Sequence, residues 1–469
     1  MKILFVMSRL KYLPYFQSSL ELIADRGHEL VLLLLHASDG RREQAWADAM
    51  AARPNVTIVV EHQFKGDPTH KPARSLRRAS EYLRYQAPEY EGLFEFRRGK
   101  ARERSPRWTR MPLAGPVVAA FDRAMPVSPR PAAFVREVRP DVVAVCDPGR
   151  PGALLSAYVS TAREQGIPVA LCVPSWDNLS TGQLTRVVPD AMLVWNDAQV
   201  KEAEEIHGIP RELVIATGAT RFDEWFARTP RDAAAFKAHA GLDPQRPYVL
   251  WVGGALLPAA RTEAELAYDW VEALRAAGDD IGVLLRPHPM RVDDWNAVDF
   301  SGFENVTVFP RRDNTMPVDE EQRADYFDSL YHASVVVGVN SSAMIEAAVV
   351  GRPVLALMAP EFDGSTTGMF HFAYLLEENG GPVRTATSIG EHIAKLREPR
   401  GDAQAFVQRF VRPHGLDQPA TPLFVDALER VQAGPPLREP ANVRVLRGMI
   451  RFALRAHSAV GTRRARLFA

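Results

Sequence analysis

The sequence has few cysteines, no long apolar run and no excess of charge of either sign. Its two cysteines, Cys146 and Cys172, each stand near the end of an apolar run and lack the spacing of a CxxC or zinc site. We therefore expect two reduced thiols in the core. Lys and Arg together number 57, as do Asp and Glu. A neutral chain lacks the broad basic field that nucleic acids require, so nucleic acid is excluded as a partner.

Signals for membrane insertion, secretion and cofactor binding are also missing. No window approaches the roughly 20 apolar residues needed to span a bilayer. The first residues, MKILFVMSRLKY, lack the apolar core and cleavage site of a signal peptide, and we expect a cytoplasmic protein. The first strand–helix–strand unit has no GxGxxG, and no DxD, HExxH or carboxylate cluster stands out. We therefore expect neither a cofactor nor a metal ion.

Short apolar runs of strand length recur along the chain. They alternate with stretches of helical periodicity, such as Tyr15–Arg26, Ala153–Gln165 and Glu263–Ala277. Continuous apolar strands indicate parallel sheets covered on both faces. Because 469 residues exceed one ordinary core, we predict an α/β protein of two parallel-sheet domains that face a cleft. The predicted strands are Lys2–Ser8, Leu30–Leu35, Val56–Val60, Asp141–Cys146, Pro168–Val173, Ala191–Trp195, Leu213–Thr217, Tyr248–Val252, Ile281–Leu285, Val306–Phe309, Ser334–Val339 and Pro353–Leu357.

Interruptions of this alternation set the predicted domain boundaries. The first domain covers 1–228 and includes a basic helical insertion at about 65–130. A polar linker follows at 229–247, then a second domain at 248–415 and C-terminal helices at 416–469.

Two basic segments stand out in this neutral chain. One is Arg97–Arg110, and the other is the tail 441–469, which has seven arginines and no acid. Four tail arginines share one helical face beside an apolar stripe, the pattern of a basic amphipathic helix. These are Arg444, Arg447, Arg451 and Arg455. We predict peripheral attachment to an anionic membrane at its inner face. The alternatives are a solvated charged face and an apolar stripe that packs on the first domain.

Polar residues just after strands are site candidates, because ligands bind beyond the carboxyl ends of parallel strands. Asn340, Ser341 and Ser342 follow the strand Ser334–Val339 at a helix start, where backbone N–H groups and the helix dipole favour a phosphate. Glu346, one turn further in, is suited to accept hydrogen bonds from ribose hydroxyls. The alternative is an ordinary serine N-cap with a solvent-facing glutamate.

The stretch 346–354, EAAVVGRPV, resembles the donor-domain signature of GT-B proteins. Over about residues 140–425 the chain distantly resembles the UDP-N-acetylglucosamine 2-epimerase and glycosyltransferase superfamily, and also the CDP-glycerol glycerophosphotransferase and capsule-polysaccharide synthesis groups. Residues 217–223, TGATRFD, look like the TGNxxxD segment of the epimerase-like group, with Ala219 in place of the usual asparagine. The resemblance implies two Rossmann-like domains of the GT-B type and a nucleotide-sugar donor.

Two further elements are similar to the donor side of these families. Residues 286–289, RPHP, are similar to an RxHP element whose histidine faces the nucleotide phosphates or the reacting centre. The prolines fix the direction of His288, which suits phosphate contact or acid catalysis, with a structural hydrogen bond as the alternative. Arg286 is a candidate clamp for the donor phosphate. Gly253 and Gly254 look like the glycine turn that lets the backbone approach a diphosphate.

The remaining candidates also follow predicted strands. Thr366, Thr367 and His371 come after Pro353–Leu357, in a loop that approaches the donor sugar in the superfamily, and a structural role is the alternative for His371. In the first domain Asp177 is a candidate base toward an acceptor hydroxyl. The candidate acceptor-binding residues are Asp147, Arg150, Trp176, Asn178, Ser180 and Thr181. The alternative for this loop is a self-bonded Asx turn with a packed tryptophan.

Together these features predict a metal-independent glycosyltransferase. The donor is a nucleoside-diphosphate sugar bound by the second domain, and the acceptor is a glycan or a lipid-linked molecule on the first. Three alternatives stay open: a CDP-polyol phosphotransferase, a nucleotide-sugar 2-epimerase and a non-catalytic GT-B scaffold. The oligomeric state is not readable from the sequence.

Overall fold

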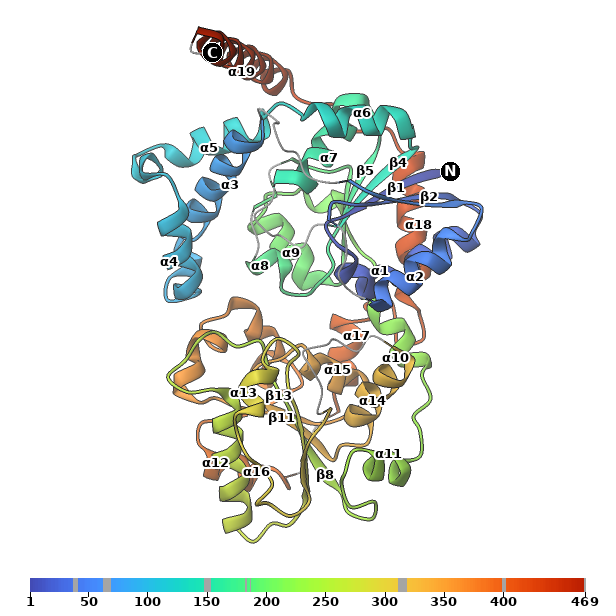
Figure 1. Cartoon of the computed structure of the whole chain (residues 1–469), viewed down its shortest axis with the longest axis vertical. Helices are drawn as coiled ribbons and strands as arrows, with labels where there is room; N and C mark the ends of the chain where they lie inside the picture. The colour runs from blue at the N-terminus through green and yellow to red at the C-terminus, as the bar shows by residue number, and fades with distance from the viewer. Residues whose placement is uncertain are drawn as a thin grey trace. The chain divides into compact units, whose positions relative to one another are not determined.

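The computed structural model describes residues 1–36, 41–61, 69–146, 153–181, 184–185, 187–310, 319–398 and 402–467. The chain forms two compact units (Figure 1). Unit 1 comprises Met1–Glu91, Phe96–Arg221 and Arg412–Ala469, and unit 2 comprises Gly92–Glu95 and Phe222–Val411. The first unit is therefore assembled from both ends of the chain, whereas the second is almost one continuous segment.

The described part of unit 1 contains a seven-stranded parallel sheet with the order β3-β2-β1-β4-β5-β6-β7. Each strand is a short apolar run, and β1, β4 and β5 are buried along almost their whole length. The order reverses direction between β1 and β4, which creates a topological switch point there. The strands are β1 (Lys2–Met7), β2 (Glu29–Leu34), β3 (Val56–Val60), β4 (Val142–Cys146), β5 (Val169–Cys172), β6 (Ala191–Val194) and β7 (Val214–Ala216).

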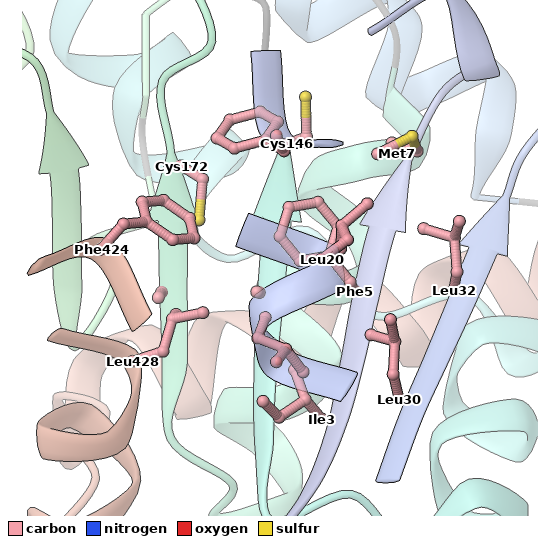
Figure 2. Close-up of a cluster of buried hydrophobic side chains, with 14 of the residues drawn as sticks. Ile3, Phe5, Met7, Leu20, Leu30, Leu32, Cys146, Cys172, Phe424 and Leu428 are labelled. Atoms are coloured by element: carbon pink, nitrogen blue, oxygen red, sulfur yellow. The ribbon is translucent and has the colours of Figure 1, made fainter. Parts of the chain in front are cut away.

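Helices cover both faces of this sheet. Side chains of α1 and α18 pack on one face in a cluster that includes Phe5, Leu20 and Phe424 (Figure 2). Helices α6 and α7 pack on the other face through Val135 and Tyr158. The helices of unit 1 are α1 (Leu13–Asp25), α2 (Arg41–Ala51), α3 (His70–Arg84), α4 (Glu95–Arg104), α5 (Ala114–Arg123), α6 (Pro129–Val138), α7 (Ala153–Gln165), α8 (Asn178–Thr181), α9 (Asp197–Glu205), α18 (Ala420–Ala433) and α19 (Ala441–Leu467).

Helix α18 closes the first unit against the start of the chain. Arg26 pairs with Asp426 at 2.7 Å, and His28 contacts Glu429 at 2.8 Å. Beneath these surface pairs lies the apolar cluster of Figure 2, which also contains Cys146 and Cys172. Both cysteines are buried and neither forms a disulfide, which confirms the prediction of two reduced core cysteines.

The described part of unit 2 contains a six-stranded parallel sheet with the order β10-β9-β8-β11-β12-β13. Its switch point falls between β8 and β11, and the residues after these two strands are therefore placed for ligand binding. The strands are β8 (Tyr248–Val252), β9 (Gly282–Arg286), β10 (Val306–Val308), β11 (Val335–Gly338), β12 (Val354–Leu357) and β13 (Val383–Ala386). The helices are α10 (Asp223–Ala227), α11 (Ala233–His239), α12 (Glu263–Ala276), α13 (Val292–Asn296), α14 (Glu320–Tyr331), α15 (Ala343–Val349), α16 (Ile389–Lys395) and α17 (Gln404–Phe410).

The segment 229–247 is not a free linker, as the sequence suggested, but part of unit 2. Arg231 bonds to Asp325 at 2.5 Å and also to Asp328, both on α14. In α11, Phe236 is buried and lies near Tyr248 of β8. The aspartates lie some 90 residues further along the chain than Arg231. The polar composition of the segment therefore gave no sign that it packs on unit 2.

The twelve predicted strands are confirmed within one or two residues at their ends, and the prediction of two parallel-sheet α/β units is confirmed. The edge strand β13, with the sequence VRTA, was missed because it is short and half polar. Among the helices that the structure describes, none combines the length and the apolar character needed to cross a membrane.

Candidate functional site

The carboxyl edge of the unit 2 sheet gathers candidates from four neighbouring strands. Gly253 and Gly254 follow β8, Arg286 ends β9, Asn340 follows β11, and the loop of Thr366 follows β12. These strands flank the switch point between β8 and β11. The structure thus brings the predicted donor residues to one edge of one sheet, where a ligand meets several loops at once.

The glycine turn is required by close packing of the strand ends. A Cβ atom on Gly254 would lie 2.2 Å from the carbonyl oxygen of Asn340, and one on Gly253 would lie 2.8 Å from the backbone nitrogen of His288. The amide of Gly253 donates to the carbonyl of Arg286 at 2.8 Å, and that of Gly254 donates to Glu263 at 2.7 Å. These glycines hold three loops together, and diphosphate contact at the turn stays a prediction.

Glu263 is a member of the site that the sequence analysis missed. It is the first residue of α12, is buried, and accepts hydrogen bonds from the Gly254 amide and, at 3.2 Å, from the Trp251 indole. Burial raises the pKa of its carboxyl to about 8, although these hydrogen bonds act in the opposite direction. The sequence signal that could have identified Glu263 is its position at a helix start, nine residues after Gly254.

Arg286 is a buried cation with an unused donor. Its side chain lies over the ring of Tyr326, with 4.6 Å between the guanidinium carbon and the ring centroid. Burial lowers its pKa to about 10, so the group stays charged at neutral pH. Its buried Nη1 atom has no hydrogen-bond partner among the described residues. A buried, unpartnered N–H on a cation is costly unless an anion or water meets it.

Glu346 lies close to this cation on α15 and is also buried, with 3% of its surface exposed. The hydroxyl of Tyr326 donates a short hydrogen bond to its carboxylate. Both Glu346 and Tyr326 favour the charged form of Arg286 electrostatically. The predicted solvent-facing alternative for Glu346 is therefore wrong. Tyr326 was not predicted, because nothing in its helical context distinguishes it from a core tyrosine.

The serines before α15 lie close to this cluster but are largely engaged in the turn. Ser341 accepts a hydrogen bond from the Ala343 amide at 3.3 Å, and the Met344 amide donates to the Ser341 carbonyl at 3.0 Å. Ser342 is exposed. Asn340 donates to the carbonyl of Ser365 and so ties the loop after β11 to that after β12. Phosphate contact by these three residues stays a prediction.

In the loop after β12, one of the two candidate threonines is exposed and the other is buried. Thr366 is fully buried and donates to the Phe362 carbonyl at 3.4 Å, whereas Thr367 is exposed. His371 is buried, and its ring lies 6.2 Å from that of Phe94, a residue of the short segment that groups with unit 2. The packing of His371 favours the structural alternative for this residue.

His288 is half-buried and is held by its own loop. The Met290 amide donates to its Nδ1 at 3.2 Å. Burial, with a smaller contribution from Arg291, lowers the pKa of the imidazole, so the ring is neutral at pH 7. Since Nδ1 accepts, the proton of the neutral ring lies on Nε2. Among the described residues no partner is found for that N–H, which leaves a directed hydrogen-bond donor at the end of β9.

A small pocket adjoins this edge of unit 2. It has a volume of about 270 Å³ and lies among the loop 254–262, the start of α12 and Phe362. Arg291 and Trp295 form its other wall, and Arg291 is fixed by donating to the Leu256 carbonyl at 2.7 Å. Among the described residues no group of three or more His, Cys, Asp or Glu side chains is arranged to hold a metal ion.

In unit 1 the candidate loop after β5 is mostly self-bonded. Asn178 accepts from the Ser175 amide at 2.9 Å, while the hydroxyls of Ser180 and Thr181 donate to the Asp177 carbonyl at 3.1 and 2.6 Å. Trp176 is buried. The loop is thus self-bonded around a packed tryptophan, as the alternative expected, although the Asn178 bond runs back to Ser175 and is not an Asx turn. The half-buried Asp177 carboxylate is left as the chemical group of the loop. Asp147 and Arg150 lie outside the described residues.

Comparison with solved structures identifies the fold. The UDP-GlcNAc 2-epimerase of Methanocaldococcus jannaschii matches with a TM-score of 0.52 and 11% identity, over 92% of this chain and 100% of that chain. The S. aureus MnaA–UDP structure matches with a TM-score of 0.52 and 11% identity, over 94% and 100%. Another UDP-N-acetylglucosamine 2-epimerase structure gives 0.51 and 12%, over 94% and 98%. No family model and no curated protein matches the sequence.

These matches confirm the fold that the sequence resemblance implied. The chain has the two-domain α/β fold of these UDP-N-acetylglucosamine 2-epimerase structures, which is the fold that the GT-B resemblance implied. At 11–12% identity the likeness concerns the fold alone.

Proposed function

We propose that this chain is a glycosyltransferase that binds a nucleoside-diphosphate sugar on unit 2 and transfers the sugar to a glycan or lipid-linked acceptor. The proposal starts from Arg286, a buried cation with a free Nη1 beside the switch point of a parallel sheet. A diphosphate supplies the anionic oxygens that such a group lacks, and a guanidinium pairs with phosphate through two parallel hydrogen bonds.

The neighbouring groups support a diphosphate at this position. Glu263 is largely protonated at neutral pH and His288 is uncharged, so neither opposes an anion strongly nor competes with Arg286 for it. The Nε2–H of His288 is suited to donate to a phosphate oxygen. The Glu346 carboxylate, already held by Tyr326, is suited to accept from ribose hydroxyls. UDP is the ligand named for the S. aureus MnaA structure, which shares this fold.

In the proposed reaction an acceptor oxygen forms a bond to C1 of the sugar, and the bond between C1 and the diphosphate oxygen breaks. The electron pair leaves with the nucleoside diphosphate, and the acceptor proton goes to a base or to solvent. Arg286 and His288 would stabilise the departing charge by preorganised hydrogen bonds. Asp177 stays the candidate base, and catalysis rests mainly on positioning.

A 2-epimerase is the second candidate, because two of the matched structures are named as such enzymes. An epimerase returns the nucleotide sugar with one inverted centre and needs no acceptor. A transferase releases a nucleoside diphosphate in proportion to product. A CDP-polyol phosphotransferase would instead release CMP, and a non-catalytic scaffold would release nothing. Nucleotide product analysis with and without acceptor glycans separates all four.

The direct test is a thermal-shift screen of UDP, GDP, CDP, ADP and their sugars. A ligand at 100 times its dissociation constant stabilises by about 2.7 kcal/mol. With the best nucleotide, Arg286→Gln should weaken affinity roughly 10- to 100-fold, because a hydrogen bond to a charged group contributes about 1.5–3 kcal/mol. Unchanged affinity in the variant, or no stabilisation by any nucleotide, would contradict the proposal.

Arg352 offers a matched control. Its guanidinium also lies over a tyrosine, with 5.3 Å between its carbon and the centroid of the Tyr331 ring. It precedes β12, however, and so belongs to the amino edge of the sheet. Arg352→Gln should leave nucleotide affinity unchanged, which separates the loss of a phosphate contact from the general loss of an arginine–tyrosine stack.

A further inference from the structure

Helix α5 of unit 1 leaves an apolar face uncovered. Val117 and Phe121 are four residues apart on one side of the helix, with 47% and 41% of their surface exposed. Leu113, the residue just before the helix, is 78% exposed. The buried side of the helix, with Val118 and Asp122, packs toward α3. An amphipathic surface helix normally has polar residues outside its buried face, whereas this helix exposes apolar side chains there.

Helix α19 has the same character. Val445, Met449 and Phe452 lie on one side, with 65%, 64% and 76% of their surface exposed. The other side holds the helix to unit 1, where Arg447 pairs with Glu439 at 2.5 Å and with Glu164 at 3.1 Å. Arg447 also donates to the Arg123 carbonyl at the end of α5, at 3.1 Å. The two helices therefore meet within one unit (Figure 1).

The packing of α19 differs from what its aligned arginines suggested. The sequence suggested that the aligned arginines of α19 face a membrane together, but Arg447 is buried and Arg451 pairs with Glu164 at 3.1 Å. The stripe with Leu446 and Ile450 is half-buried, as the packing alternative expected. The side chain of Arg455 lies outside the described residues. The exposed apolar residues are a second stripe, which the sequence analysis did not single out.

Exposed cations lie near these apolar residues in the chain. Arg107 and Arg110 are in the turn that precedes α5, Arg123 ends α5, and Arg444 adjoins Val445 of α19. Between residues 107 and 123 the one acid is Asp122, which is buried and lies 3.9 Å from Arg77. Because the chain as a whole is neutral, this positive charge is local.

We propose that the outer faces of α5 and α19 form a docking surface for an anionic lipid bilayer. Exposed apolar side chains enter the boundary between headgroups and acyl chains, and flanking arginines meet anionic headgroups. A second copy of the chain fits less well, because a symmetric contact through this surface would bring like-charged arginines together. The surface is independent of nucleotide binding in unit 2.

Sedimentation with vesicles tests this surface on the full chain. We expect binding to an equal mixture of phosphatidylcholine and phosphatidylglycerol at low salt, weaker binding at high salt, and little binding to phosphatidylcholine alone. Val117→Glu/Phe121→Glu and Met449→Glu/Phe452→Glu should each weaken binding at least tenfold. Arg107→Gln/Arg110→Gln should weaken it for the anionic vesicles. Met290→Glu, an equally exposed apolar position of unit 2, is the control and should bind like the parent chain.

The proposal is overturned if the parent chain does not bind the mixed vesicles at low salt, or if the glutamate variants bind as well as the Met290 control. It is also overturned if light scattering shows that the parent is a dimer, that these variants are monomers and that neither binds lipid, because the surface then joins two copies. Circular dichroism and nucleotide-dependent melting of the α5 and α19 variants show that their fold and unit 2 are unaffected.

Discussion

Three buried or half-buried ionisable residues near the carboxyl edge of the unit 2 sheet have pKa values shifted mainly by loss of water. Burial lowers the pKa of Arg286 to about 10, raises that of Glu263 to about 8 and lowers that of His288. At neutral pH the arginine stays charged, the imidazole is neutral and the carboxyl is mostly protonated. Of these three groups only the arginine is charged, and its unpartnered Nη1 is suited to a diphosphate oxygen.

Glu263 makes stability depend on pH. Its folded pKa of about 8 exceeds the ordinary 4.5, so its favourable contribution is complete below pH 4.5 and is lost as pH rises to 8. The loss is on the order of a few kcal/mol. Denaturant unfolding should show that the parent loses stability relative to Glu263→Gln between pH 5 and 8. Glu265→Gln, on the same helix, should show no such trend, because the pKa of Glu265 is lowered. Parallel curves for parent and Glu263→Gln would contradict the assignment.

His288 can be tested by amide substitution, because its Nε2–H is the proposed donor. In Gln the amide nitrogen approximates the position of Nε2, whereas in Asn it approximates Nδ1. Turnover should fall less than about tenfold in His288→Gln and about 100-fold or more in His288→Asn and His288→Ala, the range typical of a lost catalytic proton donor. Melting temperatures serve as the control. If turnover instead fell in parallel with melting temperature across the three variants, the role of His288 would be structural.

At the scale of elements, the unit 2 edge depends on how closely its loops approach one another. Gly254 allows the turn after β8 to lie against the residue after β11, and Asn340 then ties that residue to the loop after β12. The amide of Gly254 also binds Glu263 at the start of α12. One residue without a side chain thus sets the relative positions of three elements.

Gly254→Ala should therefore destabilise the chain although it adds a single methyl group. The new Cβ would lie 2.2 Å from a backbone oxygen, which forces the backbone to move. Overpacking of this kind costs about 1–3 kcal/mol. Gly302→Ala is a suitable control, because no atom lies within 4 Å of its added Cβ. Calorimetry should show a lower melting temperature than the parent for Gly254→Ala and almost no change for Gly302→Ala. Equal melting temperatures of the two variants would contradict the packing argument.

The sequence allowed the strands and strand ends to be predicted, because buried parallel strands are continuous apolar runs and ligand residues follow them. Arg286 and Glu346 became candidates in this way. The sequence did not allow the role of Tyr326 to be predicted, since the contact between Tyr326 and Glu346 depends on how α14 packs beside α15. The attachment of Arg231 to α14 was missed for the same reason. Hydrophobic periodicity indicates which residues face a core, but it does not indicate which residues from distant parts of the chain they contact.

At the scale of the whole molecule, unit 1 is closed by its last helices. Phe424, Val425 and Leu428 of α18 are almost fully buried among residues from the first half of the chain. Burying such side chains contributes about 1.5–3 kcal/mol each, so their sum is comparable with the stability of an ordinary domain. The C-terminal segment is therefore a structural part of the first unit.

Two truncations separate the roles of the final helices. A chain ending at Pro440 keeps α18 and should fold and bind nucleotide like the parent, while losing much of its affinity for anionic vesicles. A chain ending at Val411 lacks α18 and should lose cooperative unfolding of unit 1, seen as protease sensitivity confined to residues before 222. Equal protease resistance of both truncated chains would contradict the structural role of α18.

The split composition of unit 1 has a consequence for the order of synthesis. During translation, residues 1–221 leave the ribosome first but lack α18, which together with α1 covers one face of their sheet. Unit 2 follows as an almost unbroken segment and is complete as soon as Val411 has emerged. The unit that begins the chain is thus the last to be finished. Until α18 arrives, its nascent sheet exposes apolar surface that a chaperone would have to shield.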